Sequence, residues 1–292
     1  MSTRWLIPAL LALLLLPAAC ASQAVTGAAS PRQGTTAKDF EPKNFSRSTT
    51  VDNTWLPLRP GTQFVYTGST NEGKKRVRHR LVSIVTDLTK VVGGVRSVVT
   101  WDRDYSEGQL VEAELSFFAQ DNAGNVWHLG EYPEEYEDGK FVKAPAWIAG
   151  LKGARAGIEM KAKPRLGTPS YSQGFAPPPV NWRDRAKVEK TGEKTCVPVA
   201  CYRDVLVTRE FNKDEPGQYQ LKFYARGVGN VRVGWGGPEN TDKEVLVMAK
   251  LVRLSPAGLA GIRREALKLE KHAYVVSKNV YGRTPPARRG SP

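Results

Sequence analysis

The sequence has few of the residues and motifs on which enzyme chemistry commonly depends. Its 292 residues include three cysteines and three histidines. None of the histidines stands in an HExxH pattern, and GTPSYSQG at 167–174 lacks the GxSxG spacing of a hydrolase nucleophile. GVGNV at 227–231 lacks the third glycine of a dinucleotide-binding loop. We therefore expect a protein that is not an enzyme and that holds neither a cofactor nor a metal.

Long apolar runs are also scarce. Residues 1–19 carry one charge, Arg4, and an apolar run from Leu6 to Leu16. This run is shorter than the about 20 apolar residues that a membrane-spanning helix needs. It ends in small residues, which is typical of an export signal. The pattern predicts a signal peptide at 1–19.

Cys20 follows Ala18 and Ala19 and resembles the cysteine of a bacterial lipobox, which is acylated with chains such as palmitate. Pro17 departs from that motif, which prefers leucine three residues before the cysteine. We predict lipidation of Cys20. The protein would then be anchored to the outer face of the cell membrane, or held in the periplasm or outer membrane as a lipoprotein. The alternative is cleavage near Ala19 or Ala21 and simple secretion.

The two other cysteines, Cys196 and Cys201, are close in the sequence and flank Pro198. Export permits disulfides, and we predict that these two cysteines form one that pins a turn. Their spacing is not CxxC and no histidine is nearby, which disfavours a redox motif or a zinc site.

The chain divides into a leader, a tether, a body and a tail. Small and polar residues dominate 20–44, which indicates a flexible tether. No change of composition and no repeat divides the rest, so 45–274 should be a single β-rich domain. The basic, proline-containing residues 275–292 should be a flexible tail.

Residues 110–131 give the clearest strand pattern. Apolar residues alternate with polar ones from Val111 to Ala119, and Asp121 to Gly124 provide a turn before a returning strand. Similar segments recur along the body and predict a meander of roughly ten antiparallel strands. So many strands should curl into a half-barrel or a barrel.

Ser255 and Pro256 read as the start of the only long helical pattern. Apolar residues follow at steps of three and four, which predicts an amphipathic helix at 256–274 that closes one face of the sheet. A helix lying on a membrane surface is the alternative.

The formal net charge of +14 would ordinarily point to nucleic acid. Export and the lack of a recognition motif argue against this, and we expect no nucleic-acid partner. Anionic lipids or acidic envelope polymers are the expected counter-ions. The simpler interpretation is that the basic residues form solvated surface.

Two groups of side chains deserve a site prediction. The tryptophans are numerous, and we take Trp101, Trp127 and Trp147 as candidates for lining a ligand cavity inside the curled sheet. The three histidines, His79, His128 and His272, have polar neighbours or lie near the end of the predicted helix and are interpreted as surface or edge residues.

Four segments, in this order, resemble a family of uncharacterised bacterial exported proteins and lipoproteins. They are PLRPGTQFVYTG at 57–68, FFAQDNAGNVWHLGE at 117–131, DVLVTREF at 204–211 and YARGVGNV at 224–231. The resemblance implies the same meander and a location in the cell envelope, and it supplies no activity and no catalytic residues. A weaker likeness of architecture links the chain to Lol-type lipoprotein carriers and related lipid-binding half-barrels.

These observations favour a membrane-anchored, non-catalytic envelope lipoprotein that binds an amphiphilic or apolar ligand or an envelope partner. One alternative is a structural or assembly protein that binds acidic wall polymers. A less favoured alternative is a hydrolase that acts through Asp102, Asp104 or Glu131.

Overall fold

Strands make up most of the structure, a computed structural model that describes residues 40–238 and 243–290. These residues belong to one compact unit that spans 36–292. The predicted signal peptide, Cys20 and most of the predicted tether lie outside the described residues.

The elements run in a nearly unbroken series of strands followed by one helix. The strands are β1 (Thr62–Glu72), β2 (Lys75–Val92), β3 (Val95–Ser106), β4 (Gln109–Gln120), β5 (Val126–Glu137), β6 (Lys140–Lys143), β7 (Trp147–Ile148), β8 (Arg155–Met160), β9 (Tyr171–Ser172), β10 (Gly174–Phe175), β11 (Arg185–Val197), β12 (Ala200–Phe211), β13 (Tyr219–Ala225), β14 (Gly229–Gly236), β15 (Val245–Arg253) and β16 (Arg288–Arg289). The helix is α1 (Pro256–Val276), and single 3-10 turns lie at Pro42–Asn44 and Tyr281–Arg283.

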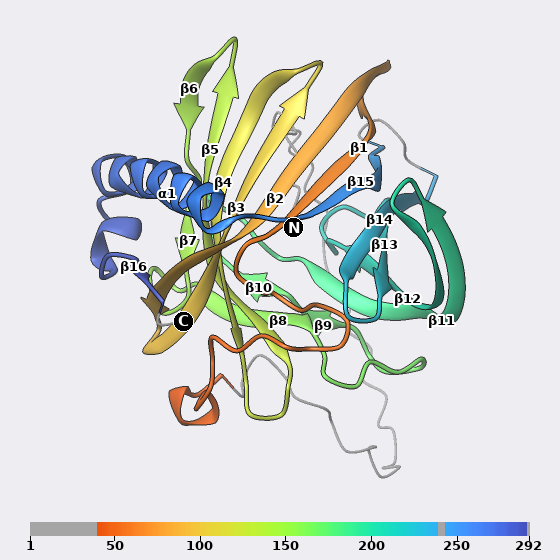
Figure 1. Cartoon of the computed structure of the whole chain (residues 1–292), viewed down its shortest axis with the longest axis horizontal. Coiled ribbons are helices and arrows are strands. Elements are labelled where there is room, and N and C mark those ends of the chain that lie inside the picture. Colours follow the sequence, from red (N-terminus) through yellow and green to blue (C-terminus); the bar gives the residue numbers. More distant parts are fainter. Residues whose placement is uncertain (1–39, 239–242, 291–292) are drawn as a thin grey trace, which may run out of the picture. The chain divides into compact units, whose positions relative to one another are not determined.

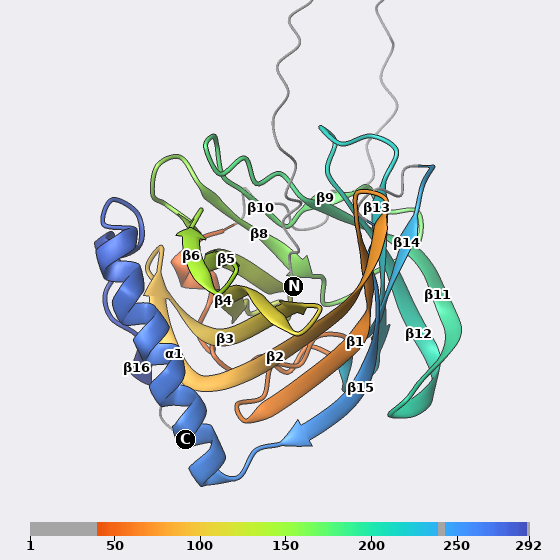
Figure 2. The same cartoon turned by 90° about the horizontal axis from the view of Figure 1, so that it is seen from above.

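The strands form one antiparallel sheet that bends round on itself (Figures 1 and 2). Its order is β10-β8-β5-β4-β3-β2-β1-β15-β14-β13-β12-β11-β9. The two edge strands, β9 and β10, belong to a single segment from Tyr171 to Phe175, yet no ladder joins them and the sheet is not closed. The predicted curled antiparallel sheet is confirmed, in its open form.

The curl depends on a join between the first and last long strands, β1 and β15. Gly68 of β1 pairs with Leu246 of β15, and a Cβ atom at Gly68 would lie 1.9 Å from the carbonyl oxygen of Val245. Any larger residue would push the two strands apart. Glycine at this position lets two successive meanders, β1–β5 and β11–β15, merge into one sheet.

Both faces of the sheet are buried at β4, but they carry different kinds of side chain. On the outer face, defined as the face that α1 covers, Leu115 and Phe117 of β4 join a core with Ile84 and Trp127. The opposite, inner face of β4 carries Glu114 and Ser116, which are also buried. The alternation predicted for β4 is therefore present, but both of its sides are withdrawn from water.

Helix α1 covers part of the outer face (Figure 2). It begins where the side chain of Ser255 accepts a hydrogen bond of 3.1 Å from the backbone nitrogen of Gly258, the capping pattern that the sequence predicts. Ala266, Leu269 and Ala273 are buried against the sheet. No helix among the described residues is long and apolar enough to cross a membrane.

A buried ion pair fastens α1 to the sheet. Lys90 of β2 is fully buried, and its Nζ lies 2.9 Å from Glu270 of α1, 3.0 Å from the hydroxyl of Tyr274 and 2.8 Å from the carbonyl oxygen of Pro285. The ring of Tyr281 lies 4.1 Å below the same ammonium group. The ammonium group of Lys90 thus has a counter-charge and two further hydrogen-bond acceptors, which a buried charge requires.

The residues after the helix differ from the predicted flexible tail at 275–292. Helix α1 continues to Val276, Tyr281 is fully buried, and β16 pairs with Leu88 and Thr89 of β2. The prediction relied on charge and proline content and gave no weight to Tyr281. This tyrosine anchors the segment because it inserts beside Lys90.

The predicted disulfide joins Cys196 to Cys201, with an S–S distance of 2.01 Å. The two residues face each other across the β11–β12 ladder, and Val197 and Ala200 pair inside them. The bond therefore pins a hairpin turn, as expected.

We predict that Glu270→Gln destabilises the fold by about 3–5 kcal/mol, because it leaves the ammonium of Lys90 buried without a counter-charge. The measurement is the free energy of unfolding from denaturant titration. Lys268→Ala is the control, since Lys268 pairs with Glu265 on the exposed side of the same helix and should change stability little. Equal effects of the two substitutions would contradict the role given to Lys90.

Candidate functional site

The inner face of the sheet carries a belt of buried ionisable side chains. These are Asp102 on β3, Glu114 on β4, Glu131 on β5, Glu159 on β8 and Lys222 on β13, all 8% exposed or less. The register explains why several share a face, because Asp102 pairs with Glu114, and Glu131 pairs with Ser116 beside it. Carboxylates outnumber the single lysine, so this inner belt is acidic.

The curl brings together charges from strands that are distant in the sheet order. Asp184, just before β11, interacts electrostatically with the negative charge of Glu131 on β5 and the positive charge of Lys222 on β13. Burial and the neighbouring Glu210 raise the pKa of Asp184 to about 7. A carboxyl with such a pKa both donates and accepts hydrogen bonds near neutral pH.

Lys222 supplies the positive charge of the inner belt. Its Nζ lies 2.5 Å from Glu210 of β12, and both side chains are nearly buried. Burial by itself lowers the pKa of Lys222, but the charges of Glu210 and Glu159 outweigh it and raise the pKa overall. The lysine therefore stays protonated.

Glu114 lies in the most acidic part of the inner belt. Burial, and then repulsion from Glu131 and Glu112, raise its pKa well above the ordinary range, although the hydroxyl of Ser116 donates a hydrogen bond to it. Two carboxylates this close cannot both be charged at low cost. Burial and the neighbouring carboxylates thus both disfavour the charged form of Glu114.

Several polar atoms around the inner belt are buried and, among the described residues, have no hydrogen-bond partner. They are Asp102 Oδ1, His128 Nδ1, Trp147 Nε1, Tyr171 Oη and Trp182 Nε1. Leaving a buried donor or acceptor unsatisfied costs about 1–3 kcal/mol. These atoms mark positions where an ordered water or a ligand would satisfy a group of the protein.

Four of the rings near these atoms form an inner aromatic cluster. His128 stacks on Phe118 at 4.8 Å and meets Trp147 at 5.0 Å and Trp182 at 5.9 Å, measured between ring centroids. Gly174 makes room for them, because a Cβ there would lie 2.7 Å from the ring of Trp147. Burial lowers the pKa of His128 to about 3, so its ring is neutral. With Nε2 donating to the carbonyl oxygen of Gly130 at 3.2 Å, Nδ1 is left as an acceptor.

The structure does not bring the three candidate tryptophans together. Trp147 belongs to the inner aromatic cluster. Trp127 belongs to the outer-face core, where its Nε1 donates to Asp121 at 2.8 Å. Trp101 also joins that core, with the guanidinium of Arg103 4.4 Å above its ring. Trp182, which is not one of the three candidates, stacks on Trp147 with ring centroids 6.0 Å apart.

The interpretation of His79 and His128 as surface or edge residues is wrong. They are 6% and 2% exposed, respectively. The sequence held a signal for His79, which alternates in phase with Val77 and Leu81. It held none for His128, because the polar side of its strand also looks like a solvent-facing one. His272 alone fits the interpretation, with an exposed side chain that pairs with Glu134.

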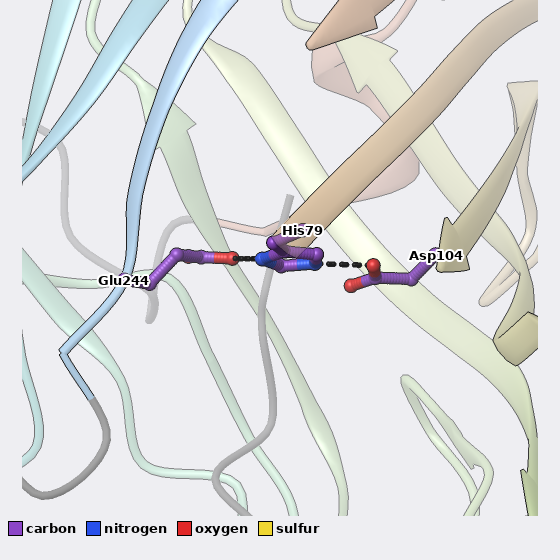
Figure 3. A group of neighbouring side chains, drawn as sticks. All are labelled: His79, Asp104 and Glu244. Carbon is purple, nitrogen blue, oxygen red and sulfur yellow. Dashed lines mark hydrogen bonds and ion pairs between the residues drawn. The ribbon is translucent and has the colours of Figure 1, made fainter. Parts of the chain in front are cut away.

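His79 forms a second group of ionisable residues, with Asp104 and Glu244 (Figure 3). Its Nε2 bonds to Asp104 of β3, and its Nδ1 lies 2.9 Å from Glu244, directly before β15. Strand β1 separates β2 from β15, and Gly68 is the β1 residue opposite His79. Because Gly68 has no side chain, the imidazole can reach across β1 to Glu244.

The charge state of this His79 triad follows from its geometry. Burial alone lowers the pKa of His79, but its hydrogen bonds to Asp104 and Glu244 raise it to about 10. The ligand atoms of the three residues lie within 4.8 Å of one another, which is close enough for a shared metal ion. However, the imidazole ring lies between the two carboxylates with a nitrogen directed at each (Figure 3). The triad is thus arranged as an imidazolium clamp that ties β2, β3 and β15, and a metal would have to displace its protons.

Comparison with known proteins adds little to this description. No protein-family model and no curated protein matches the sequence. A Bacteroides fragilis protein with a YmcC-like fold, described as exported, aligns with 68% of this chain and 99% of its own, at 13% identity and a TM-score of 0.37. A Parabacteroides distasonis protein described as a lipoprotein aligns with 69% of this chain and 100% of its own, at 14% identity and a TM-score of 0.32. Values this low support no conclusion about function, and the resemblance to an exported family stays a prediction.

We predict that His79 stabilises the fold in a pH-dependent manner. Folding raises its pKa from 6.5 to about 10, so its contribution is complete below pH 6.5 and is lost as the pH rises through 10. The difference in unfolding free energy between wild type and His79→Gln should therefore shrink between these two pH values. A difference that does not change over this range would contradict the charged clamp.

Proposed function

We propose that the protein is a non-catalytic, membrane-anchored lipoprotein of the cell envelope that binds an amphiphilic ligand on the inner face of its curled sheet. The observation that carries the proposal is the set of buried, unpartnered polar atoms beside the inner belt. The anchor is Cys20, whose sequence context favours acylation.

The chemistry of the inner face defines the polar part of the ligand. The hydroxyl of Tyr171 and the indole nitrogens of Trp147 and Trp182 can donate, so the ligand needs acceptors. Asp102 Oδ1 and His128 Nδ1 accept, so it also needs donors or a positive charge. A head group with hydroxyl or amino groups supplies both kinds of partner.

The inner aromatic cluster favours an apolar part in the same ligand. Trp147 and Trp182 are stacked and nearly buried, and Phe118 continues the apolar surface beyond His128. Aromatic rings next to a few directed polar groups are typical of small-molecule sites. A wholly apolar ligand would leave Asp102 Oδ1 and the hydroxyl of Tyr171 without hydrogen-bond partners, so an amphiphile fits better.

One observation favours the alternative that the protein is a hydrolase. Carboxyls with raised pKa values, such as Glu114 and Asp184, are often found at catalytic sites. Of the three predicted catalytic carboxylates, Asp104 is held by His79, whereas Asp102 and Glu131 lie in the inner belt. Hydrolysis of esters or glycans that disappears in Asp102→Asn would favour this alternative over a binding protein.

We predict that Tyr171→Phe separates binding from stability. The substitution removes a buried hydroxyl without a partner, so the ligand-free protein should be as stable as wild type or more stable, by about 1 kcal/mol. It should nevertheless retain less co-purifying ligand, as measured by native mass spectrometry.

The matched control for this prediction is Tyr66→Phe. The hydroxyl of Tyr66 donates to the carbonyl oxygen of Asn230 at 2.7 Å, so its loss should cost about 1 kcal/mol and leave ligand retention unchanged. If Tyr171→Phe instead behaves like Tyr66→Phe, the hydroxyl of Tyr171 is structural and the proposed site is wrong.

We also predict that Cys20→Ala releases the exported protein from the membrane fraction, because the substitution removes the thiol that would carry the acyl chain. Fractionation of cells expressing either form, with mass analysis of the mature N-terminus, measures this. Membrane retention of the Cys20→Ala form, or an unacylated wild-type N-terminus, would contradict the anchor.

A further inference from the structure

A basic pocket lies on the outer surface, where α1 begins beside the end of β15 and the short strand β16. Its volume is about 460 Å³, the size of many small-molecule sites. It is formed by residues from four parts of the chain, namely the turn before β1, a bulge in β2, the β15–α1 junction and β16. The lining includes Pro60, Asp87, Arg253, Leu259, Arg263 and Arg289. None of these residues belongs to the inner belt.

Three arginines and one carboxylate line this pocket, and two of the arginines contact the carboxylate. Arg263 donates to Asp87 Oδ2, and Arg289 Nε lies 3.4 Å from the same oxygen. Arg253 donates to the hydroxyl of Thr62. The single carboxylate leaves an excess of positive charge, and each guanidinium has further N–H groups beyond the contact named here.

Asp87 orients two of the arginines. It lies in the bulge of β2 between Val85 and Thr89, and its backbone oxygen accepts a hydrogen bond of 2.8 Å from Gly290, next to Arg289. The bulge thus places β16, which carries Arg289, beside Asp87, and α1 brings Arg263 to the same carboxylate oxygen. An orientation prepared in this way lowers the cost of binding a ligand.

The start of α1 contributes less than the arginines. Pro256 has no N–H group, and Ser255 already accepts the hydrogen bond of Gly258. The helix dipole adds a modest attraction for a negative charge at this end. The selectivity of the pocket therefore comes from its guanidinium groups.

We propose that this pocket binds a phosphate-type anion, either the phosphate of a lipid head group or a soluble phosphate. Guanidinium groups match the geometry of phosphate oxygens and donate two hydrogen bonds at once. A lipid source is compatible with the exposed basic residues further along α1, namely Arg264, Lys268 and Lys271, and with Lys278 just after the helix, which would attract an anionic surface. The proposal is independent of the ligand on the inner face.

The test uses the full chain with Cys20→Ala, so that no acyl chain contributes to membrane binding. Inorganic phosphate is titrated calorimetrically, and sedimentation measures binding to vesicles of phosphatidylglycerol mixed with phosphatidylcholine. The pocket variant is Arg253→Ala with Arg289→Ala, which keeps the Arg263–Asp87 pair. We expect it to bind the anion at least about tenfold more weakly, since a hydrogen bond to a charged group is worth about 1.5–3 kcal/mol.

The matched control is Arg264→Ala with Lys271→Ala, which also removes two charges, both from exposed positions of α1 outside the pocket. A loss in the pocket variant that exceeds the loss in the control, for either probe, supports the site. Binding of phosphate identifies a soluble source, and binding of vesicles alone identifies a lipid head group. Equal losses in both variants, or no binding of either probe, would overturn the proposal. Thermal unfolding without ligand verifies that both variants are folded.

Discussion

The structure depends on how a strongly curled sheet accommodates charge on the face that it turns inward. A curled sheet removes its inner face from water, so every ionisable side chain there must find a partner or change its protonation state. This protein uses both means. Lys222 pairs with Glu210, His79 lies between two carboxylates, and burial raises the pKa of Glu114 well above its ordinary range. A few buried polar atoms of the inner face, such as Asp102 Oδ1 and the hydroxyl of Tyr171, have no partner in the described structure. These atoms are the reason for proposing a ligand there.

The two faces divide the work of the fold. On the outer face, aliphatic and aromatic side chains pack against α1, and the buried Lys90–Glu270 pair fixes the register of helix and sheet. Burial of these apolar side chains is the main source of the free energy that stabilises the fold. The inner face can therefore tolerate unsatisfied groups, each of which costs stability. Functional sites are commonly placed where a stable scaffold permits such a cost.

The sequence predicts those parts of the fold that depend on local pattern. The alternation in residues 110–131, the Ser255 cap and the Cys196–Cys201 pair all predict what the structure contains. The inner belt could not be predicted in this way, because Glu114 and Glu131 look like solvent-facing residues until the sheet is known to curl. The His79 triad was missed for a related reason. Its members come from strands separated in the sequence, and only Gly68 lets the imidazole reach Glu244 across β1.

The most direct test of the account is a crystal structure of the protein isolated from cell envelopes without removal of bound lipid. The account predicts density for an amphiphile on the inner face, with polar atoms within hydrogen-bond distance of the hydroxyl of Tyr171 and of Asp102 Oδ1. An inner face in which those atoms are satisfied by the protein's own side chains, with no bound molecule, would contradict it.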